Sequence, residues 1–127
     1  MSDTENPLVT FALFAYNQEQ FIREAVEGAF AQTYEPLEII LSDDCSTDRT
    51  FEIMQAMAAE YKGPHQVLAR KTEANRGPML HVAEVAALAH GGLLILAAGD
   101  DVSKASRTGV LVVAWRATGA WRKTKPW

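Results

Sequence analysis

The sequence predicts an α/β fold, a mostly parallel open sheet with helices on both faces. Short apolar runs rich in β-forming residues alternate four times with stretches whose apolar residues recur at helical spacing. Such alternation is typical of a parallel sheet covered by helices. The chain has 127 residues, of which 48% are hydrophobic and 22% charged, as expected for one globular domain. We expect this domain at residues 8–118, with tails at 1–7 and 119–127.

The predicted strands are expected at residues 8–14, 37–41, 66–70 and 93–98. The first is a continuous apolar run, which indicates burial on both sides of the sheet. The predicted helices lie between them, at residues 21–30, 51–61, 79–89 and 110–117. Pro36 ends the first helix, and Gly63-Pro64 ends the second. Ser46 or Thr47 is the predicted N-cap of the second helix.

Composition excludes several classes of protein. The net charge of −4 gives no bias toward nucleic acid, and the single cysteine, Cys45, forms no intrachain disulfide. Residues 1–7 are polar and acidic, unlike a signal peptide, and no apolar run approaches the ~20 residues that span a bilayer. We therefore expect a cytoplasmic protein that is soluble or peripheral to the cytoplasmic face of the membrane.

Charge is unevenly distributed along the chain. Residues 102–127 contain six basic and no acidic residues. This basic end could bind phosphates or an anionic membrane surface. The alternative interpretation is a solvated helix followed by a loose tail.

Polar segments follow all four predicted strands. They are Ala15-Tyr16-Asn17, Asp43-Asp44, Asn75-Arg76-Gly77 and Asp100-Asp101. Ligands of open parallel sheets bind at the carboxyl ends of the strands, so we expect these segments to converge. Four carboxylates at one edge repel one another unless a cation joins them. Mg²⁺ usually takes one or two carboxylates and substrate phosphates, so the pattern predicts a metal–diphosphate site.

Other phosphate and metal sites lack their signatures here. The first strand is not followed by G-x-G-x-x-G, and no G-x-x-x-x-G-K-[ST] occurs. No Cys/His spacing suggests zinc, and no G-x-S-x-G elbow suggests a hydrolase. We interpret His81, one turn into the third predicted helix, as structural, with a place facing the pocket as the alternative.

The ordered set of motifs resembles the family 2 glycosyltransferases of the GT-A fold. The resemblance runs from about Leu8 to Arg107. Its segments are Phe14-Ala15-Tyr16-Asn17, Ala31-Gln32-Thr33-Tyr34, Asp43-Asp44-Cys45-Ser46-Thr47-Asp48, Asn75-Arg76-Gly77 and Ala98-Gly99-Asp100-Asp101. It implies a truncated nucleotide-diphospho-sugar transferase-like fold, because family members continue well past this point.

The resemblance also implies roles for individual residues. Backbone around Ala15, Tyr16 and Asn17 would line the base and ribose of a nucleoside-diphosphate sugar. A UDP-sugar and a role in polysaccharide biosynthesis are expected. Asp44 would accept a hydrogen bond from the nucleobase. The other implied contacts are Asp100 with the ribose, Asp101 with a bridging Mg²⁺ or Mn²⁺, and Arg76 with base or phosphate. Helix capping and the helix dipole are the structural alternatives for the three aspartates.

The function expected is transfer of a sugar to an unknown glycan, lipid or protein acceptor, with inversion. No Asp, Glu or His follows Asp101, so the general base is not assigned within this chain. A nucleotide-sugar-binding fragment without transfer activity is therefore the alternative. A phosphoacceptor receiver domain is a third reading, but its acidic pair should follow the first strand, where Ala15-Tyr16-Asn17 stands instead.

Overall fold

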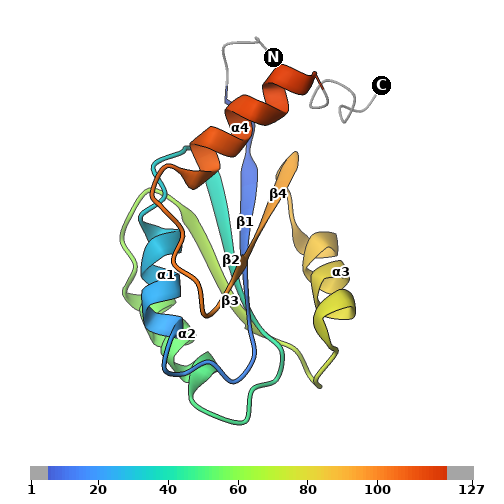
Figure 1. The fold of residues 1–127 in the computed structure, drawn as a ribbon. Coiled ribbons are helices and arrows are strands. Elements are labelled where there is room, and N and C mark those ends of the chain that lie inside the picture. The colour runs from blue at the N-terminus through green and yellow to red at the C-terminus, as the bar shows by residue number, and fades with distance from the viewer. Residues whose placement is uncertain (1–5, 120–127) are drawn as a thin grey trace.

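The computed structural model describes residues 6–119 and confirms the predicted α/β class. Its four strands form one sheet in the order β3-β2-β1-β4, with all neighbours parallel (Figure 1). The strands are β1 (Val9–Ala15), β2 (Leu37–Asp43), β3 (Gln66–Lys71) and β4 (Leu93–Ala98). The helices are α1 (Ile22–Phe30), α2 (Thr50–Glu60), α3 (Pro78–Leu88) and α4 (Arg107–Thr118).

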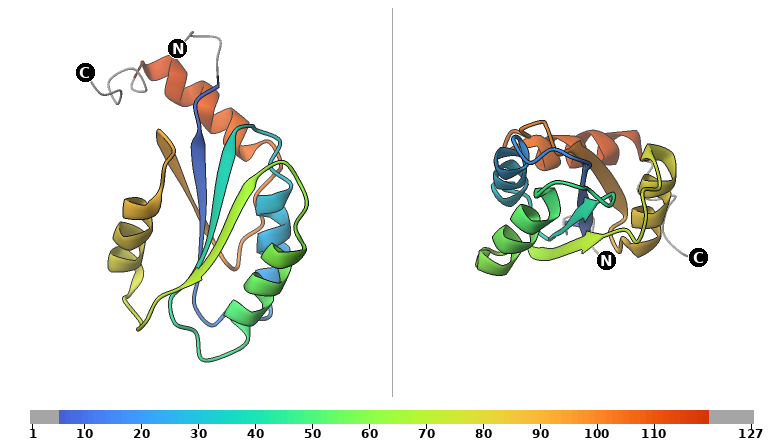
Figure 2. Two further views of the ribbon diagram at one scale, coloured as in Figure 1. Left: turned by 180° about the vertical axis from the view of Figure 1, so that it is seen from behind. Right: turned by 90° about the horizontal axis from the view of Figure 1, so that it is seen from below.

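Helices cover both faces of the sheet. Helices α1 and α2 lie on one face and α3 on the other, while α4 crosses at the end where the strands begin (Figures 1 and 2). Alternate residues of β1 serve the two faces, as strand geometry requires. Phe11 and Leu13 belong to the larger core with α1 and α2, whereas Ala12 packs with Ile40 and Val85 toward α3. The strand order reverses between β1 and β4, so a crevice is expected at their carboxyl ends.

The segment after β4 is held along α1. A Cβ on Gly28 would lie 3.1 Å from the backbone N and O of Ser103, so the two backbones pass close together. Gln32 is buried, and its amide donates to Lys104 O at 2.8 Å and accepts from the N–H and hydroxyl of Thr108 at 3.0 and 2.7 Å. The motif segment that contains Gln32 therefore fixes the path of the chain between Asp101 and α4.

A second polar cluster joins β1 and β2 to the turn before β4, near the end where the strands begin. Glu38 accepts from the Thr10 hydroxyl at 2.8 Å and from the His90 N–H at 2.9 Å, and its other oxygen lies 2.7 Å from His90 Nδ1. Burial opposes the charged form, but the hydrogen bonds from His90 and Thr10 outweigh it and lower the pKa of Glu38. Gly91 passes so close that an added Cβ would lie 2.5 Å from Thr10 N.

Most predicted boundaries differ from the structure by one to three residues, and β4 agrees at both ends. The predicted N-cap at Ser46 or Thr47 is wrong, because α2 begins at Thr50 after Arg49. Asp48 instead accepts from the Thr50 N–H at 2.9 Å. None of the helices within residues 6–119 is long and apolar enough to cross a membrane. Residues 1–5 and 120–127 of the predicted tails lie outside the described residues.

Candidate functional site

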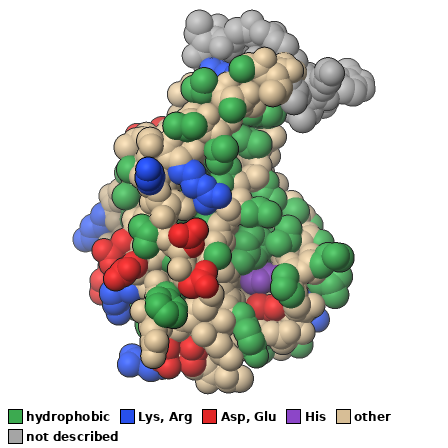
Figure 3. Space-filling view, in the orientation of Figure 1, with side chains coloured by type: hydrophobic (Ala, Val, Ile, Leu, Met, Phe, Trp, Pro, Cys, Tyr) green, Lys and Arg blue, Asp and Glu red, His purple; other side chains and the backbone are tan. Residues whose placement is uncertain are grey.

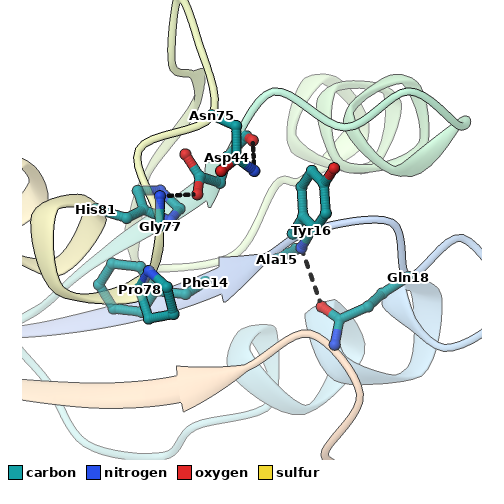
Figure 4. A pocket seen from close by; sticks show the side chains of 9 residues that line it. All are labelled: Phe14, Ala15, Tyr16, Gln18, Asp44, Asn75, Gly77, Pro78 and His81. Carbon is teal, nitrogen blue, oxygen red and sulfur yellow. Dashed lines mark hydrogen bonds between the residues drawn. The ribbon is translucent and has the colours of Figure 1, made fainter.

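Two adjoining cavities open at the carboxyl ends of the strands. The larger, of about 420 Å³, is lined from β1, the turn after it, the β2 end and the start of α3 (Figure 4). The smaller, of about 360 Å³, is lined by β4, α3, Asp101 and Arg107. Both share Phe14, Pro78 and His81. On this side of the molecule, acidic, hydrophobic and histidine side chains meet (Figure 3). The cavities therefore form one stretch of surface along the sheet edge.

Asp44 lies in the lining of the larger cavity and is buried. Its Oδ1 accepts from the Arg76 N–H at 2.8 Å and the Thr72 hydroxyl at 3.2 Å, and its Oδ2 accepts from the Gly77 N–H at 3.0 Å. Burial opposes the charged form, but the two backbone donors, with smaller effects of His81 and Thr72, outweigh it and lower the pKa of Asp44. Asp44 therefore stands in the cavity as a carboxylate that can only accept hydrogen bonds.

Asp43 and Asn17 hold the loops after β2 and β1 together. The Asp43 carboxylate accepts from the Ser46 N–H at 2.8 Å and from the Ser46 hydroxyl. Ser46 Oγ in turn accepts from the Asn17 N–H at 2.8 Å, and Asn17 Oδ1 accepts from the Thr47 N–H at 2.9 Å. The Asp43 carboxylate is therefore occupied within these two loops.

Asp101 lines the smaller cavity, and Asp100 beside it is exposed. Within residues 6–119, no group of three or more His, Cys, Asp or Glu side chains is placed to hold a metal ion. Any cation at Asp101 would thus take one or two carboxylates from this chain and the rest of its shell from water and substrate. This donor set fits Mg²⁺ or Mn²⁺, which favour oxygen ligands and keep positions for phosphate.

His81 stands between the two cavities at the start of α3. Its Nε2 lies 2.7 Å from the hydroxyl oxygen of Ser42, and that oxygen accepts a hydrogen bond from Arg70 at 2.8 Å. Arg70 is paired with Glu84. The His81 ring meets Phe14 edge to face, with centroids 4.9 Å apart. Burial lowers the pKa of His81, Asp44 opposes this, and Arg70 adds to the lowering. Both interpretations of His81 therefore hold, since it is buried and also faces the pocket.

The structure brings together some of the predicted site residues. Ala15, Tyr16 and Asp44 line the larger cavity, and Asp101 lines its neighbour. Three predicted residues are in neither lining: Asn17, Arg76 and Asp100. The Arg76 side chain pairs with Glu84 at 3.5 Å, and its backbone N–H makes the contact to Asp44.

Sequence reasoning did not select several lining residues. They are Phe14, Gln18, Asn75, Gly77 and Pro78 in the larger cavity. Asn75 and Gly77 belong to the motif Asn75-Arg76-Gly77. The Gly77 N–H could have been predicted as a contact of Asp44, because a buried carboxylate needs hydrogen-bond donors. Phe14 stood inside the motif Phe14-Ala15-Tyr16-Asn17 but was not assigned to the site. Pro78 carried no signal, since apolar residues are far commoner in cores than in cavity walls.

Comparison with known proteins gives one family. The model of glycosyl transferase family 2 matches residues 10–120. An uncharacterised protein of Mycobacterium bovis is 42% identical over 88 residues, which are 68% of this chain and 25% of that protein.

Two solved structures share the arrangement of strands and helices. The mannosyltransferase PcManGT from Pyrobaculum calidifontis, in complex with GDP-Man and Mn²⁺, has a TM-score of 0.78 and 25% identity, covering 90% of this chain and 33% of its own. S. aureus TarS 1–349, in complex with UDP-GlcNAc, has a TM-score of 0.73 and 21% identity, covering 86% of this chain and 31% of its own. The chain thus spans about a third or less of the length of the proteins it matches.

Proposed function

The chain belongs to glycosyl transferase family 2 and has the GT-A fold, and we propose that it binds the nucleotide of a nucleoside-diphosphate sugar at the two adjoining cavities. The base and ribose occupy the larger cavity, and the diphosphate lies toward Asp101 in the smaller one. Residues 8–118 form the binding domain. The whole protein transfers the sugar to an acceptor.

The Asp44 carboxylate is the observation that carries this proposal. A carboxylate has about four acceptor positions, and two of them serve the Arg76 and Gly77 N–H groups. The one proton of the Thr72 hydroxyl is shared between Asp44 Oδ1 at 3.2 Å and the nearer Ala74 O at 2.8 Å. The position left on Oδ2 can accept an N–H from a nucleobase ring. Uracil, thymine and guanine have a ring N–H on their pairing edge, whereas cytosine and adenine have a lone pair there. The site is therefore proposed to select UDP, dTDP or GDP over CDP and ADP. GDP-Man and UDP-GlcNAc, bound by the two solved relatives, both belong to the favoured class.

The cation is proposed to lie at Asp101. Bound there as Mg²⁺ or Mn²⁺, it would neutralise the diphosphate and stabilise the departing nucleoside diphosphate as a Lewis acid. Asp101 N–H donates to Ala98 O at 3.1 Å, which fixes the turn that carries the carboxylate at the end of β4. Along α1, the Gly28 contact and Gln32 hold the residues after Asp101, so the ligand stands on a braced segment.

The remaining contacts follow the motif assignments. Tyr16 is 45% exposed at the mouth of the larger cavity, where its ring can stack on a base. The exposed Asp100 is proposed for the ribose hydroxyls. Arg76 reaches base or phosphate only if its guanidinium leaves Glu84, a pair that is partly exposed and therefore weak. Asn17 contributes backbone position, because its side chain is committed to Thr47.

Transfer itself is proposed for the whole protein, with inversion at the sugar. Residues 102–127 contain no Asp, Glu or His to act as general base. The alternative is that this chain alone binds the donor without transferring it. The acceptor is a glycan, lipid or protein, in a cytoplasmic reaction within polysaccharide synthesis. We propose that basic residues from Lys104 onward contact the anionic face of a membrane.

A nucleotide panel tests the proposal. Thermal unfolding is followed with UDP, dTDP, GDP, CDP and ADP, each with and without Mn²⁺, in the unchanged chain and in Asp101→Ala. A ligand at ~100 times its Kd stabilises the fold by about 2.7 kcal/mol. We expect UDP, dTDP or GDP to stabilise the chain more with Mn²⁺, and Asp101→Ala to remove the Mn²⁺ increment. The proposal fails if no nucleotide stabilises the chain, either with or without Mn²⁺.

A further inference from the structure

His81 holds one nitrogen toward the protein and the other toward the cavities. Nε2 contacts Ser42 Oγ at 2.7 Å. Nδ1 makes no hydrogen bond within the described residues, and it is not fully buried. His81 lines both cavities, so Nδ1 is the ring nitrogen that is available to a ligand there.

The chain of hydrogen bonds behind His81 decides which nitrogen carries the proton. Glu84 binds Arg70, and Arg70 can only donate, so Ser42 Oγ accepts from it at 2.8 Å. Ser42 is fully buried, and the only acceptor that its hydroxyl proton meets among the described residues is Nε2 of His81. Buried hydroxyl protons are nearly always donated. Nε2 is therefore the acceptor, and the proton of the neutral ring is on Nδ1.

We propose that the Nδ1–H of His81 donates to a carbonyl oxygen of the nucleobase, which makes His81 a specificity-determining residue of the donor site. The inference rests on the proposed nucleotide site. Asp44 accepts the ring N–H, and the donor on His81 stands beside it in the same cavity. An N–H next to a carbonyl oxygen is the pattern on the pairing edge of uracil, thymine and guanine. The lowered pKa of His81 keeps the ring neutral, so that one nitrogen donates and the other accepts.

Two substitutions separate the two nitrogens of the ring. In His81→Gln, the longer amide still reaches Ser42 in the place of Nε2 but has no donor at the Nδ1 position. In His81→Asn, the shorter amide keeps a donor near Nδ1 and loses the contact with Ser42. A role limited to packing would give both variants the same nucleotide preference.

The test measures Kd by calorimetry with Mn²⁺ for UDP, 2-thio-UDP and 4-thio-UDP, and for GDP and 6-thio-GDP. Sulfur is a weaker acceptor than oxygen. In the unchanged chain, replacing the contacted oxygen should weaken binding by roughly threefold to tenfold, the range of one neutral hydrogen bond. His81→Gln should abolish that preference, and His81→Asn should retain it. The inference is overturned if the preference is absent in the unchanged chain or survives in His81→Gln while the parent nucleotide still binds.

A spectroscopic measurement needs no variant. Long-range ¹H–¹⁵N correlation spectra of the unchanged chain show which imidazole nitrogen bears the proton. We expect Nδ1–H, and a protonated Nε2 with a bare Nδ1 would overturn the inference even if nucleotides bind. Absence of any nucleotide binding would instead defeat the proposed function, and with it the role of His81 in reading a base.

Discussion

Replacing Asp44 by Asn changes the chemistry of the nucleobase position while keeping its size. The carboxylate accepts from the Arg76 and Gly77 N–H groups through its two different oxygens. Whichever oxygen becomes the amide nitrogen, one of these N–H groups then faces a donor. With the nitrogen in place of Oδ2, the variant presents an N–H to the base position. With the nitrogen in place of Oδ1, it presents an uncharged carbonyl oxygen there, so the charged acceptor is lost in both cases.

The expected magnitudes follow from those contacts. A hydrogen bond to a charged group contributes about 1.5–3 kcal/mol and a neutral one about 0.5–1.5 kcal/mol. Losing one bond and weakening the other should lower the free energy of unfolding by about 2–3 kcal/mol. Losing the charged bond to a ring N–H should weaken UDP binding by about 2 kcal/mol, or roughly 30-fold. Cytosine offers a lone pair at that position, so CDP should lose much less affinity or gain some.

The assay is calorimetric titration of UDP and CDP with Mn²⁺, and Asp43→Asn is the matched control. Asp43 is the buried neighbouring carboxylate, it binds Ser46, and it is not in the lining of either cavity. The control should lose stability and keep the preference for UDP over CDP. An Asp44→Asn variant whose UDP and CDP affinities fall in parallel would refute the assignment of Asp44 to the nucleobase.

Three further predictions concern contacts that stabilise the fold. Gln32→Leu leaves the buried N–H of Thr108 without its acceptor and should lower the free energy of unfolding in urea by about 2–4 kcal/mol. A decrease under about 0.5 kcal/mol would contradict the role of Gln32 in holding the segment after β4. Gly91→Ala should lower the free energy of unfolding by about 1–3 kcal/mol, because the added Cβ would lie 2.5 Å from the backbone of Thr10. Gly109→Ala is the control: its Cβ would meet open space, so the change should be neutral or stabilising. Equal effects of the two substitutions would contradict the close approach at Gly91. The lowered pKa of Glu38 contributes stability that is present above pH ~4.5 and lost as pH falls through the lowered pKa. The free energy of unfolding should therefore fall less steeply below pH 5 in Glu38→Gln than in the unchanged chain, and identical slopes would contradict this.

The sequence was sufficient to predict the elements of the sheet and the strand ends where the two cavities open. β4 was predicted at both ends because six apolar residues are bounded by Gly92 and Gly99. Asp44 and Asp101 were placed at the cavities because the carboxyl ends of parallel strands meet at one edge. These predictions depend on the local pattern of apolar and polar residues and on the order of strands and helices, and both can be read from the sequence.

Choices between competing partners in the folded chain could not be predicted from the sequence. Ser46 was expected to cap α2, but its hydroxyl and N–H serve Asp43 and Asn17 in the turn. Arg76 remains a proposed contact of the site, and in the structure its guanidinium pairs with Glu84, eight residues away on α3. The direction of His81 depends on the bond from Ser42, 39 residues earlier. Such choices are made by tertiary packing, so a single sequence leaves them open.

The most direct test of the account is a crystal structure of the chain with UDP and Mn²⁺. The account predicts uracil in the cavity of about 420 Å³, with its ring N–H at hydrogen-bond distance from Asp44 and the cation bound by Asp101 beside the diphosphate. A nucleotide bound elsewhere, or bound here with its base turned away from Asp44, would contradict it.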